Sequence, residues 1–192
     1  MAKNLNQLVV IWALGKVGQR VGNGESHELA DIALQKAGAR SLVDFAPTGD
    51  DDDDLIWGFE ISSPKDALPG DVLQYRDYLQ RTIASTQSFF KDDVDFLTDN
   101  VTEAEINHEF HTAIVKTNPG NGVLTVLEQN HGGNNEVVKS TAIRWRDTLL
   151  SEVVKRKMVM RKATGKAEMA IVMDKVFILV TGTLRVFRPT AR

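Results

Sequence analysis

The first forty residues carry the hydrophobic periodicity of two helices. Apolar residues over 5–14 recur at the spacing of one helix face, and Gly15 is placed to end that helix. A glycine-rich turn follows, and a second apolar stripe predicts a helix from about 25 to 37 with Gly38 just beyond its end. Because the turn lacks the lysine-serine ending of a phosphate-binding loop, we interpret it as the approach to the second helix.

From Trp57 onward, the polar and apolar residues alternate as in strands. We predict strands at 72–75, 111–115 and 123–128, with a hairpin turn at 118–122 joining the last two. These strands would form the sheet against which the helices pack.

The remaining segments are less regular. Residues 82–90 fit either a strand or a short helix, and the acidic stretch 91–105 is typical of a surface insertion. Residues 149–160 combine apolar and basic positions in a pattern that we interpret as an amphipathic helix. The apolar, β-branched stretch 170–180 predicts one or two strands, and 182–189 a terminal strand ended by proline.

Composition restricts the possible function classes. The 192 residues suit one domain, and the net charge of −3 gives no general attraction to nucleic acid or to an anionic membrane, although a local basic patch could still bind a polyanion. The absence of cysteine excludes disulfides, cysteine zinc sites and a thiol nucleophile. The aspartate run at 50–54 is expected to be a solvated loop rather than a calcium site. With no recognisable signal or spanning segment, we expect a cytoplasmic protein, unless it is exported by a non-classical route.

Four residues form a candidate catalytic constellation. Ser26 follows a tight turn and opens a predicted helix, where the helix dipole and the backbone N–H of Ser26 would stabilise an anion. His111 begins a predicted strand, and Glu128 ends the strand that returns from it, with Asn130 close behind. Residues on neighbouring strands can meet side by side, so this order fits a nucleophile, a base and an orienting acid.

Each of these residues also has an ordinary structural interpretation. Ser26 can be a first-turn serine, His111 a half-buried histidine, Glu128 a surface carboxylate and Asn130 a turn residue. His108, three residues before His111, should point to the opposite face of a regular strand, so we expect it at the surface. The spacing of the histidines, His27 and His131 included, does not suggest a metal site.

The order of these motifs resembles the CHAP domain, a papain-like cysteine amidase and peptidase family related to NlpC/P60. The matching pieces are Gly24–Leu29, Gly70–Tyr75, His111–Val115, Thr125–Asn130 and Phe187–Pro189. The resemblance implies an α+β fold in which N-terminal helices pack on a bent antiparallel β-sheet. It also implies a single domain over 1–192, with insertions near 82–106 and 146–176.

The resemblance further implies a bacterial amide hydrolase that acts on peptidoglycan or on another peptide or amide. His111 would be the base, and Glu128 or Asn130 would orient it or contact the substrate. This chemistry needs no cofactor and no metal. The partners implied are peptidoglycan or a peptide substrate, and neither nucleic acid nor membrane.

The chain departs from the family at the nucleophile, because Ser26 stands where a cysteine is expected. Serine is neither ionised near neutrality nor as nucleophilic as a thiolate. Glu25 also replaces a common glutamine, and its carboxylate would oppose an oxyanion. Three explanations stay open: an engineered inactivation, a natural binding domain without catalysis, and a natural serine hydrolase. The alternative to a weakened hydrolase is therefore a non-catalytic domain that binds cell-wall glycan, peptide or protein. The segments 91–105 and 155–162 could also serve a protein interaction.

Overall fold

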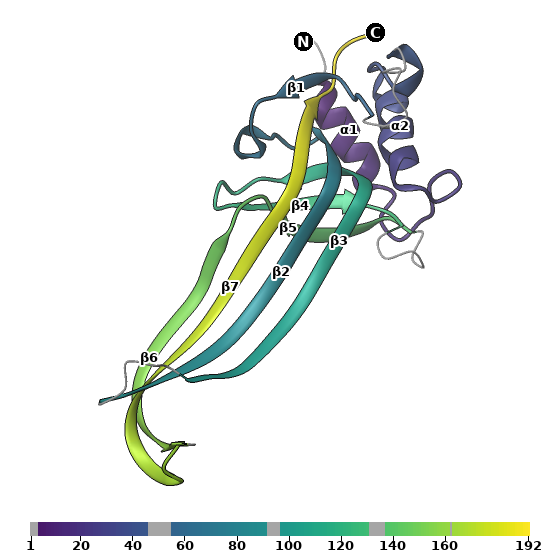
Figure 1. Cartoon of the computed structure of the whole chain (residues 1–192). Helices are drawn as coiled ribbons and strands as arrows, with labels where there is room; N and C mark the ends of the chain where they lie inside the picture. The colour runs from purple at the N-terminus through teal and green to yellow at the C-terminus, as the bar shows by residue number, and fades with distance from the viewer. Residues whose placement is uncertain (1–3, 46–54, 92–96, 131–136, 162) are drawn as a thin grey trace. The chain divides into compact units, whose positions relative to one another are not determined.

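The computed structural model describes residues 4–45, 55–91, 97–130, 137–161 and 163–192, and these are dominated by β-structure. Strands account for 57% of the described residues and helices for 17%. The elements shown in Figure 1 are α1 (Leu5–Leu14), α2 (Ser26–Ala37), β1 (Phe59–Ile61), β2 (Val72–Phe90), β3 (Leu97–Thr117), β4 (Val123–Glu128), β5 (Lys139–Arg144), β6 (Thr148–Arg161) and β7 (Lys166–Arg188), with short 3-10 turns at Leu42–Asp44 and Pro64–Asp66. The predicted α+β class is therefore wrong, because the fold is a largely antiparallel sheet with two helices.

The main source of this error is the segment predicted as a basic helix at 149–160. It is strand β6, paired antiparallel with β7 from Thr148 opposite Ile178 to Arg161 opposite Lys166. Val153, Val154 and Val159 favour a strand, and pairing along a whole neighbouring strand outweighs the helical spacing of the basic residues.

The strands join in one sheet of order β1-β7-β2-β3-β4-β5, and β6 pairs with β7 away from this path. Pairing is antiparallel between β1 and β7, between β3 and β4, between β4 and β5, and between β6 and β7. The segments predicted at 170–180 and 182–189 belong to the single strand β7, and the segment at 82–90 is part of β2.

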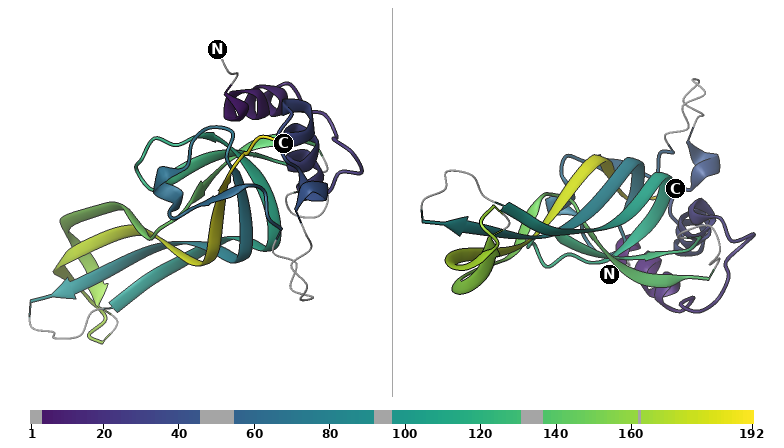
Figure 2. Two further views of the ribbon diagram at one scale, coloured as in Figure 1. Left: turned by 90° about the horizontal axis from the view of Figure 1, so that it is seen from above. Right: turned by 60° about the horizontal axis from the view of Figure 1, so that its bottom comes forward.

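The chain divides into two compact units. The first contains 1–78, 108–145 and 182–192, and the second contains 79–107 and 146–181. The segments 82–106 and 146–176, which the sequence suggests as insertions, lie in the second unit. Figure 2 shows the β6–β7 hairpin of this second unit in two views.

Both helices belong to the first unit and have the predicted ends. Helix α1 begins after Asn4, whose side chain accepts a hydrogen bond from the Asn6 backbone at 3.2 Å, and it ends at Gly15. Helix α2 ends at Gly38, which adopts the left-handed conformation at φ 74°. These two predictions are confirmed by the structure.

The core of the first unit lies between these helices and the sheet. Val9 and Ala13 of α1 and Leu29 of α2 are fully buried in one cluster with Ile114 of β3 and Leu127 of β4. Burying such side chains stabilises the unit by roughly 1.5–3 kcal/mol each. The cluster holds the first turn of α2 against strands β3 and β4.

The start of β2 and the end of β7 are joined through a buried carboxylate. Asp71 is fully buried and accepts hydrogen bonds from Asn6 Nδ2 at 2.6 Å and from the Leu68 backbone at 2.8 Å. Arg188 of β7 donates to both of its oxygens, at 3.2 and 3.0 Å. Asp71 therefore connects α1, β2 and β7.

Among the described residues, we find no helix with both the length and the apolar character needed to cross a membrane.

Candidate functional site

Ser26 is the first residue of α2, and a constrained turn places it there. Gly22 adopts φ 59°, and a Cβ at this position would overlap the carboxylate of Glu28. That carboxylate accepts a hydrogen bond from the backbone N–H of Asn23, and the Asn23 side chain accepts one from the N–H of Glu25 at 3.0 Å. As the first helical residue, Ser26 has a backbone N–H that no intrahelical bond uses.

Gln129 connects this turn to the end of β4. Its buried side chain accepts from the Val21 N–H at 3.2 Å, and it donates to the carbonyls of Val21 at 3.0 Å and Glu25 at 2.6 Å. Because Gln129 follows Glu128 directly, the same strand end positions the acid and the turn that precedes Ser26.

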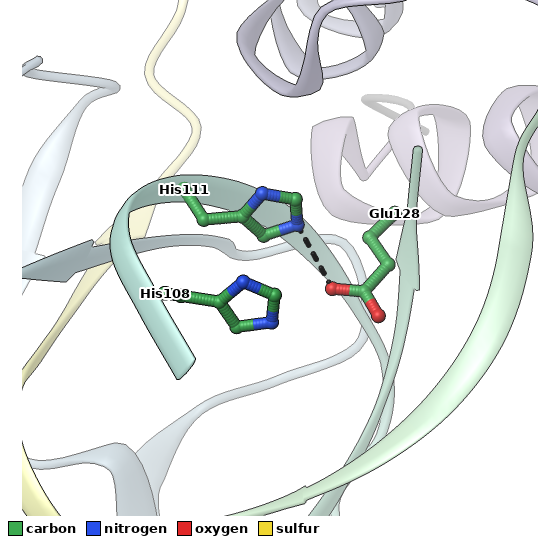
Figure 3. A group of neighbouring side chains, drawn as sticks. All are labelled: His108, His111 and Glu128. Carbon is green, nitrogen blue, oxygen red and sulfur yellow. Dashed lines mark hydrogen bonds and ion pairs between the residues drawn. The ribbon is translucent and has the colours of Figure 1, made fainter. Parts of the chain in front are cut away.

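His111 and Glu128 form the buried centre of the site. Nε2 of His111 lies 3.0 Å from Oε2 of Glu128, and Figure 3 shows the ring edge facing the carboxylate. The side chains are 5% and 0% exposed, so water contributes little to this contact. The other carboxylate oxygen accepts the hydroxyl hydrogen of Thr141 on β5. With Nε2–H donating to Glu128, the lone pair of the ring is on Nδ1.

Ser26 lies directly beside the strand that carries His111. Its Oγ accepts a hydrogen bond from the backbone N–H of Thr112, the next residue along β3, at 3.3 Å. The Thr112 hydroxyl donates to Gln74 Oε1 at 3.0 Å, and that oxygen also accepts from Trp57 Nε1 at 3.0 Å. These bonds fix β3 beside the start of α2.

Ser26 and His111 line the same pocket. The pocket has a volume of about 670 Å³, and its wall is formed by Glu25, Ser26, His27, Leu42, Leu55, Gln74, Phe110, His111 and Thr112. One part of this wall is apolar and the other carries the candidate catalytic groups, as in many small-molecule and peptide sites.

His108 differs from its prediction as a surface residue. It is only 7% exposed, and its ring stacks on His111 with centroids 4.3 Å apart and planes 10° apart (Figure 3). Two consecutive exposed residues, Glu109 and Phe110, separate the two buried histidines. The strict alternation of buried and exposed residues is therefore broken here, and two residues three apart are buried together.

Two tyrosines complete the buried aromatic group. Tyr75 meets His108 and His111 edge-on at centroid distances of 5.2 and 5.4 Å, and Tyr78 lies 5.3 Å from Tyr75. Burial, with the nearby Glu128 charge, raises the pKa of Tyr75 well above its usual value. Burial also raises the pKa of Tyr78 to about 12, although its hydrogen bond to the Arg144 carbonyl opposes this shift. Both phenols are therefore neutral beside Glu128.

The donor atoms of His108, His111 and Glu128 lie within 4.8 Å of one another, which raises the question of a metal site. A metal bound to an imidazole lies close to the ring plane, along the nitrogen lone pair. The rings of His108 and His111 are nearly parallel and stacked, with centroids 4.3 Å apart. One ion therefore cannot lie in the plane of both rings at once. The arrangement therefore fits a stacked pair of rings and not a coordination sphere.

The structure brings three of the four candidate residues into one site and gives the fourth another contact. Asn130 donates to the carboxylate of Glu25 at 3.1 Å, while Glu128 takes Nε2 of His111. Of the two groups expected to orient the histidine, Glu128 makes the contact with its ring, and the expectation that Asn130 contacts a substrate stays a prediction. The positive φ of Asn130, 58°, turns the chain at this point. His131 and the aspartates at 50–54 lie outside the described residues.

Sequence reasoning missed several residues that build the site. Gln74, Thr112, Tyr75 and Gln129 hold or surround the candidate catalytic groups through buried contacts. In the sequence these residues are polar positions within or just after predicted strands. Nothing else in the sequence marks them as part of a site. Such a pattern does not say which face of the strand each side chain occupies.

Comparison of the chain with protein-family models, with curated proteins and with solved structures finds no match.

Proposed function

We propose that this pocket is an amide-hydrolase site with Ser26 as nucleophile, His111 as general base and Glu128 as the acid that orients the base. The observation that carries the proposal is the buried His111–Glu128 contact beside a serine at a helix N-terminus, in one pocket. The order of motifs that resembles CHAP domains suggests cell-wall peptides as the substrate class.

In the proposed reaction, Ser26 Oγ attacks the amide carbonyl carbon while its proton passes to Nδ1 of His111. The first backbone N–H groups of α2 would stabilise the oxyanion. His111 then gives the proton to the leaving amine, and the C–N bond breaks to leave an acyl ester on Ser26. Water, deprotonated by His111, attacks this ester, the bond from the acyl carbon to Oγ breaks to release the acid, and His111 returns the proton to Ser26 Oγ. Glu128 stays ionised and stabilises the protonated imidazole.

The proposal also explains why the site would be slow in this form. A serine relies fully on the base, whereas a cysteine is partly ionised by the neighbouring histidine. Glu25, at the pocket wall, adds a carboxylate beside the developing oxyanion. We therefore expect Ser26→Cys to raise the rate of amide hydrolysis by about tenfold or more, because the thiolate needs no proton transfer before attack.

The test uses purified peptidoglycan and its soluble muropeptides, with released fragments identified by mass spectrometry. Wild type, Ser26→Cys and Ser26→Ala are compared, and Ser26→Cys/His111→Ala is the control for the base. Loss of the base should lower the Ser26→Cys rate by roughly 10²-fold. If Ser26→Cys folds normally and cleaves none of these substrates, the hydrolase proposal for cell-wall amides is wrong.

A second candidate function is ligand binding without catalysis. The carboxylate of Glu25, held by Asn130 beside Ser26, is the observation that favours it. This candidate expects muropeptides to raise the melting temperature of wild type and of Ser26→Ala equally. Absence of any thermal shift would rule it out for these ligands.

A further inference from the structure

The carboxylate of Glu25 is held in a fixed position at the wall of the Ser26 pocket. Its Oε2 accepts a hydrogen bond from Nδ2 of Asn130 at 3.1 Å. The backbone of the same residue is fixed on both sides, because its N–H donates to Asn23 Oδ1 at 3.0 Å and its carbonyl accepts from Gln129 Nε2 at 2.6 Å. A group that is already ordered loses little conformational entropy when it binds a ligand, so this carboxylate is suited to recognition.

Glu25 does not use its carboxylate for the helix that it precedes. It is the N-cap residue of α2, where an acidic side chain usually accepts a hydrogen bond from a backbone N–H of the first turn. No such bond is present, and the second carboxylate oxygen accepts no hydrogen bond from any residue that the structure describes. Glu25 also has no ion pair within the described part of the chain. One oxygen of an ordered carboxylate is therefore available to a ligand.

The pocket wall has no lysine or arginine to balance this charge. Among the described residues of the wall, Glu25 is the one carboxylate. The guanidinium of Arg76 lies over the ring of Phe110, 4.7 Å from its centroid, and is not part of the wall. Glu128, which contacts His111, is a second carboxylate at the site and is fully buried. A positively charged ligand is therefore favoured over a neutral or a negative one.

The charge of Glu25 opposes the proposed reaction unless the substrate neutralises it. Attack by Ser26 Oγ places negative charge on the carbonyl oxygen, and a carboxylate one residue away raises the energy of that state. An ammonium group of the substrate, bound to Glu25, would cancel this repulsion while the oxyanion forms. The carboxylate would then select the substrate rather than impair the reaction.

We propose that the pocket takes amides whose acyl part carries a primary ammonium group close to the scissile carbonyl, and that Glu25 is the subsite for this group. The inference rests on the hydrolase function proposed for Ser26 and names its substrate class. An ammonium group has three N–H donors and a positive charge, so it can bind a carboxylate oxygen in several orientations. Because Glu25 directly precedes Ser26, the ammonium group lies near the carbonyl, as in the amino-terminal residue of a peptide. Asn130 is a positioning residue that holds the carboxylate.

The first test needs no hydrolysis and uses the thiol of Ser26→Cys. Its rates of reaction with cationic 2-aminoethyl methanethiosulfonate and with anionic 2-sulfonatoethyl methanethiosulfonate are measured, and their ratio is compared with the same ratio for the exposed thiol of Ser62→Cys. The ratio cancels any difference in thiolate content between the two positions. We expect the cationic reagent to be favoured about tenfold more at position 26, because the Glu25 charge is close, and less so as salt increases.

Three variants in the Ser26→Cys protein identify the source of this preference. Glu25→Gln keeps the size of the side chain but removes its charge, so the ratio should fall to that of the control thiol. Asn130→Gly permits the same positive φ of 58° but releases the carboxylate, and should lower the ratio in part. Glu109→Gln removes an exposed charge of β3 outside the pocket wall and should leave the ratio unchanged. If Glu25→Gln preserves both the melting temperature and the ratio, the proposal is overturned.

The second test uses hydrolysis and compares muropeptides before and after acetylation of their free amino groups. For Ser26→Cys we expect kcat/KM to be about fivefold higher with the free amines, as for one partly exposed ion pair. Glu25→Gln should slow cleavage of the free amines and accelerate cleavage of the acetylated forms. Equal rates for the two forms would overturn the proposal. If Ser26→Cys cleaves neither form, the hydrolase function fails, and the reagent ratio still decides whether Glu25 is a subsite for a cation.

Discussion

At the residue scale, the two buried tyrosines beside Glu128 stay neutral in the folded protein. Tyr75 and Tyr78 are fully buried beside Glu128, and both have a raised pKa. The Tyr75 hydroxyl has no hydrogen-bond partner among the described residues. Its ionisation would place an uncompensated negative charge next to a carboxylate, so the folded protein retains the neutral phenol.

We therefore expect stability to fall at alkaline pH. The pKa of Tyr78 is about 12 in the folded protein and 10.0 in the unfolded chain. Its contribution to stability is therefore complete below pH 10 and is lost as the pH rises toward about 12. The free energy of unfolding, measured by urea titration, should therefore decline as pH rises above 10. Because the chain has two tyrosines, tyrosinate absorbance reports on these two alone.

Tyr75→Phe is the informative variant, because it removes the ionisable group without breaking a hydrogen bond. It should reduce the alkaline loss of stability. Tyr78→Phe also removes the bond to the Arg144 carbonyl and should cost about 1 kcal/mol below the unfolded pKa of 10.0, with a smaller net cost at higher pH because the variant lacks an ionisable phenol. If both tyrosines of the folded wild type ionise near pH 10, this account of the buried group is wrong.

The sequence predicts some of these residues and not others, for local reasons. His111 and Glu128 end up together because a recognisable hairpin joins their strands. Strict alternation predicts the opposite face for His108, but burial does not alternate between His108 and His111, and no single residue there signals this. The position of Asn130 just after β4 predicts that it lies near the site, but the direction of its side chain depends on a positive φ that the sequence does not show.

At the element scale, a buried carboxylate joins the start of β2 to β7. Asp71 is buried and accepts bonds from three other parts of the chain, whereas the Arg185–Glu60 pair between β7 and β1 is exposed. Removing the Asp71 carboxylate leaves the Asn6 amide and the Leu68 N–H without their acceptor in addition to breaking the pair with Arg188, which costs more than loss of a surface pair.

Asp71→Ala is therefore expected to reduce the free energy of unfolding by roughly 3 kcal/mol or more. Glu60→Ala, which acts on the same strand β7 through a surface pair, should cost less than about 1 kcal/mol. Denaturant unfolding of the two variants measures this difference. Equal effects would show that the buried contact at Asp71 does not carry the connection between β2 and β7.

Helices and strands are predictable from the sequence where glycine or a turn sequence marks their ends. Gly15, Gly38 and the turn at 118–122 mark ends that the structure reproduces. The sequence of strand β6 fits the hydrophobic period of a helix as well as that of a strand. Pairing with β7, which the sequence of β6 alone does not show, makes it a strand. The great length of β2 and β7 follows from pairing between distant segments, which local patterns do not contain.

At the scale of the whole molecule, the candidate site exists because three separated segments meet. Ser26 comes from α2, His111 from β3 and Glu128 from β4, and the core of the first unit holds them together. The sequence suggested this meeting through the order of its motifs. It did not reveal the β-rich class of the fold, because the strands of the second unit have no such motifs.

The central claim is that His111 takes the proton from the nucleophile at position 26. Because the chain has no cysteine, the effect of His111 on a thiol placed there can be measured directly. In Ser26→Cys the new thiol is the only one, so its alkylation rate as a function of pH gives its pKa. We predict a pKa below about 7.5, compared with about 8.5 for an exposed control thiol in Ser62→Cys. In Ser26→Cys/His111→Ala the value should return toward that of the control. If the thiol in Ser26→Cys has the same pKa as the control thiol, and His111→Ala does not change it, the proposed hydrolase site is contradicted.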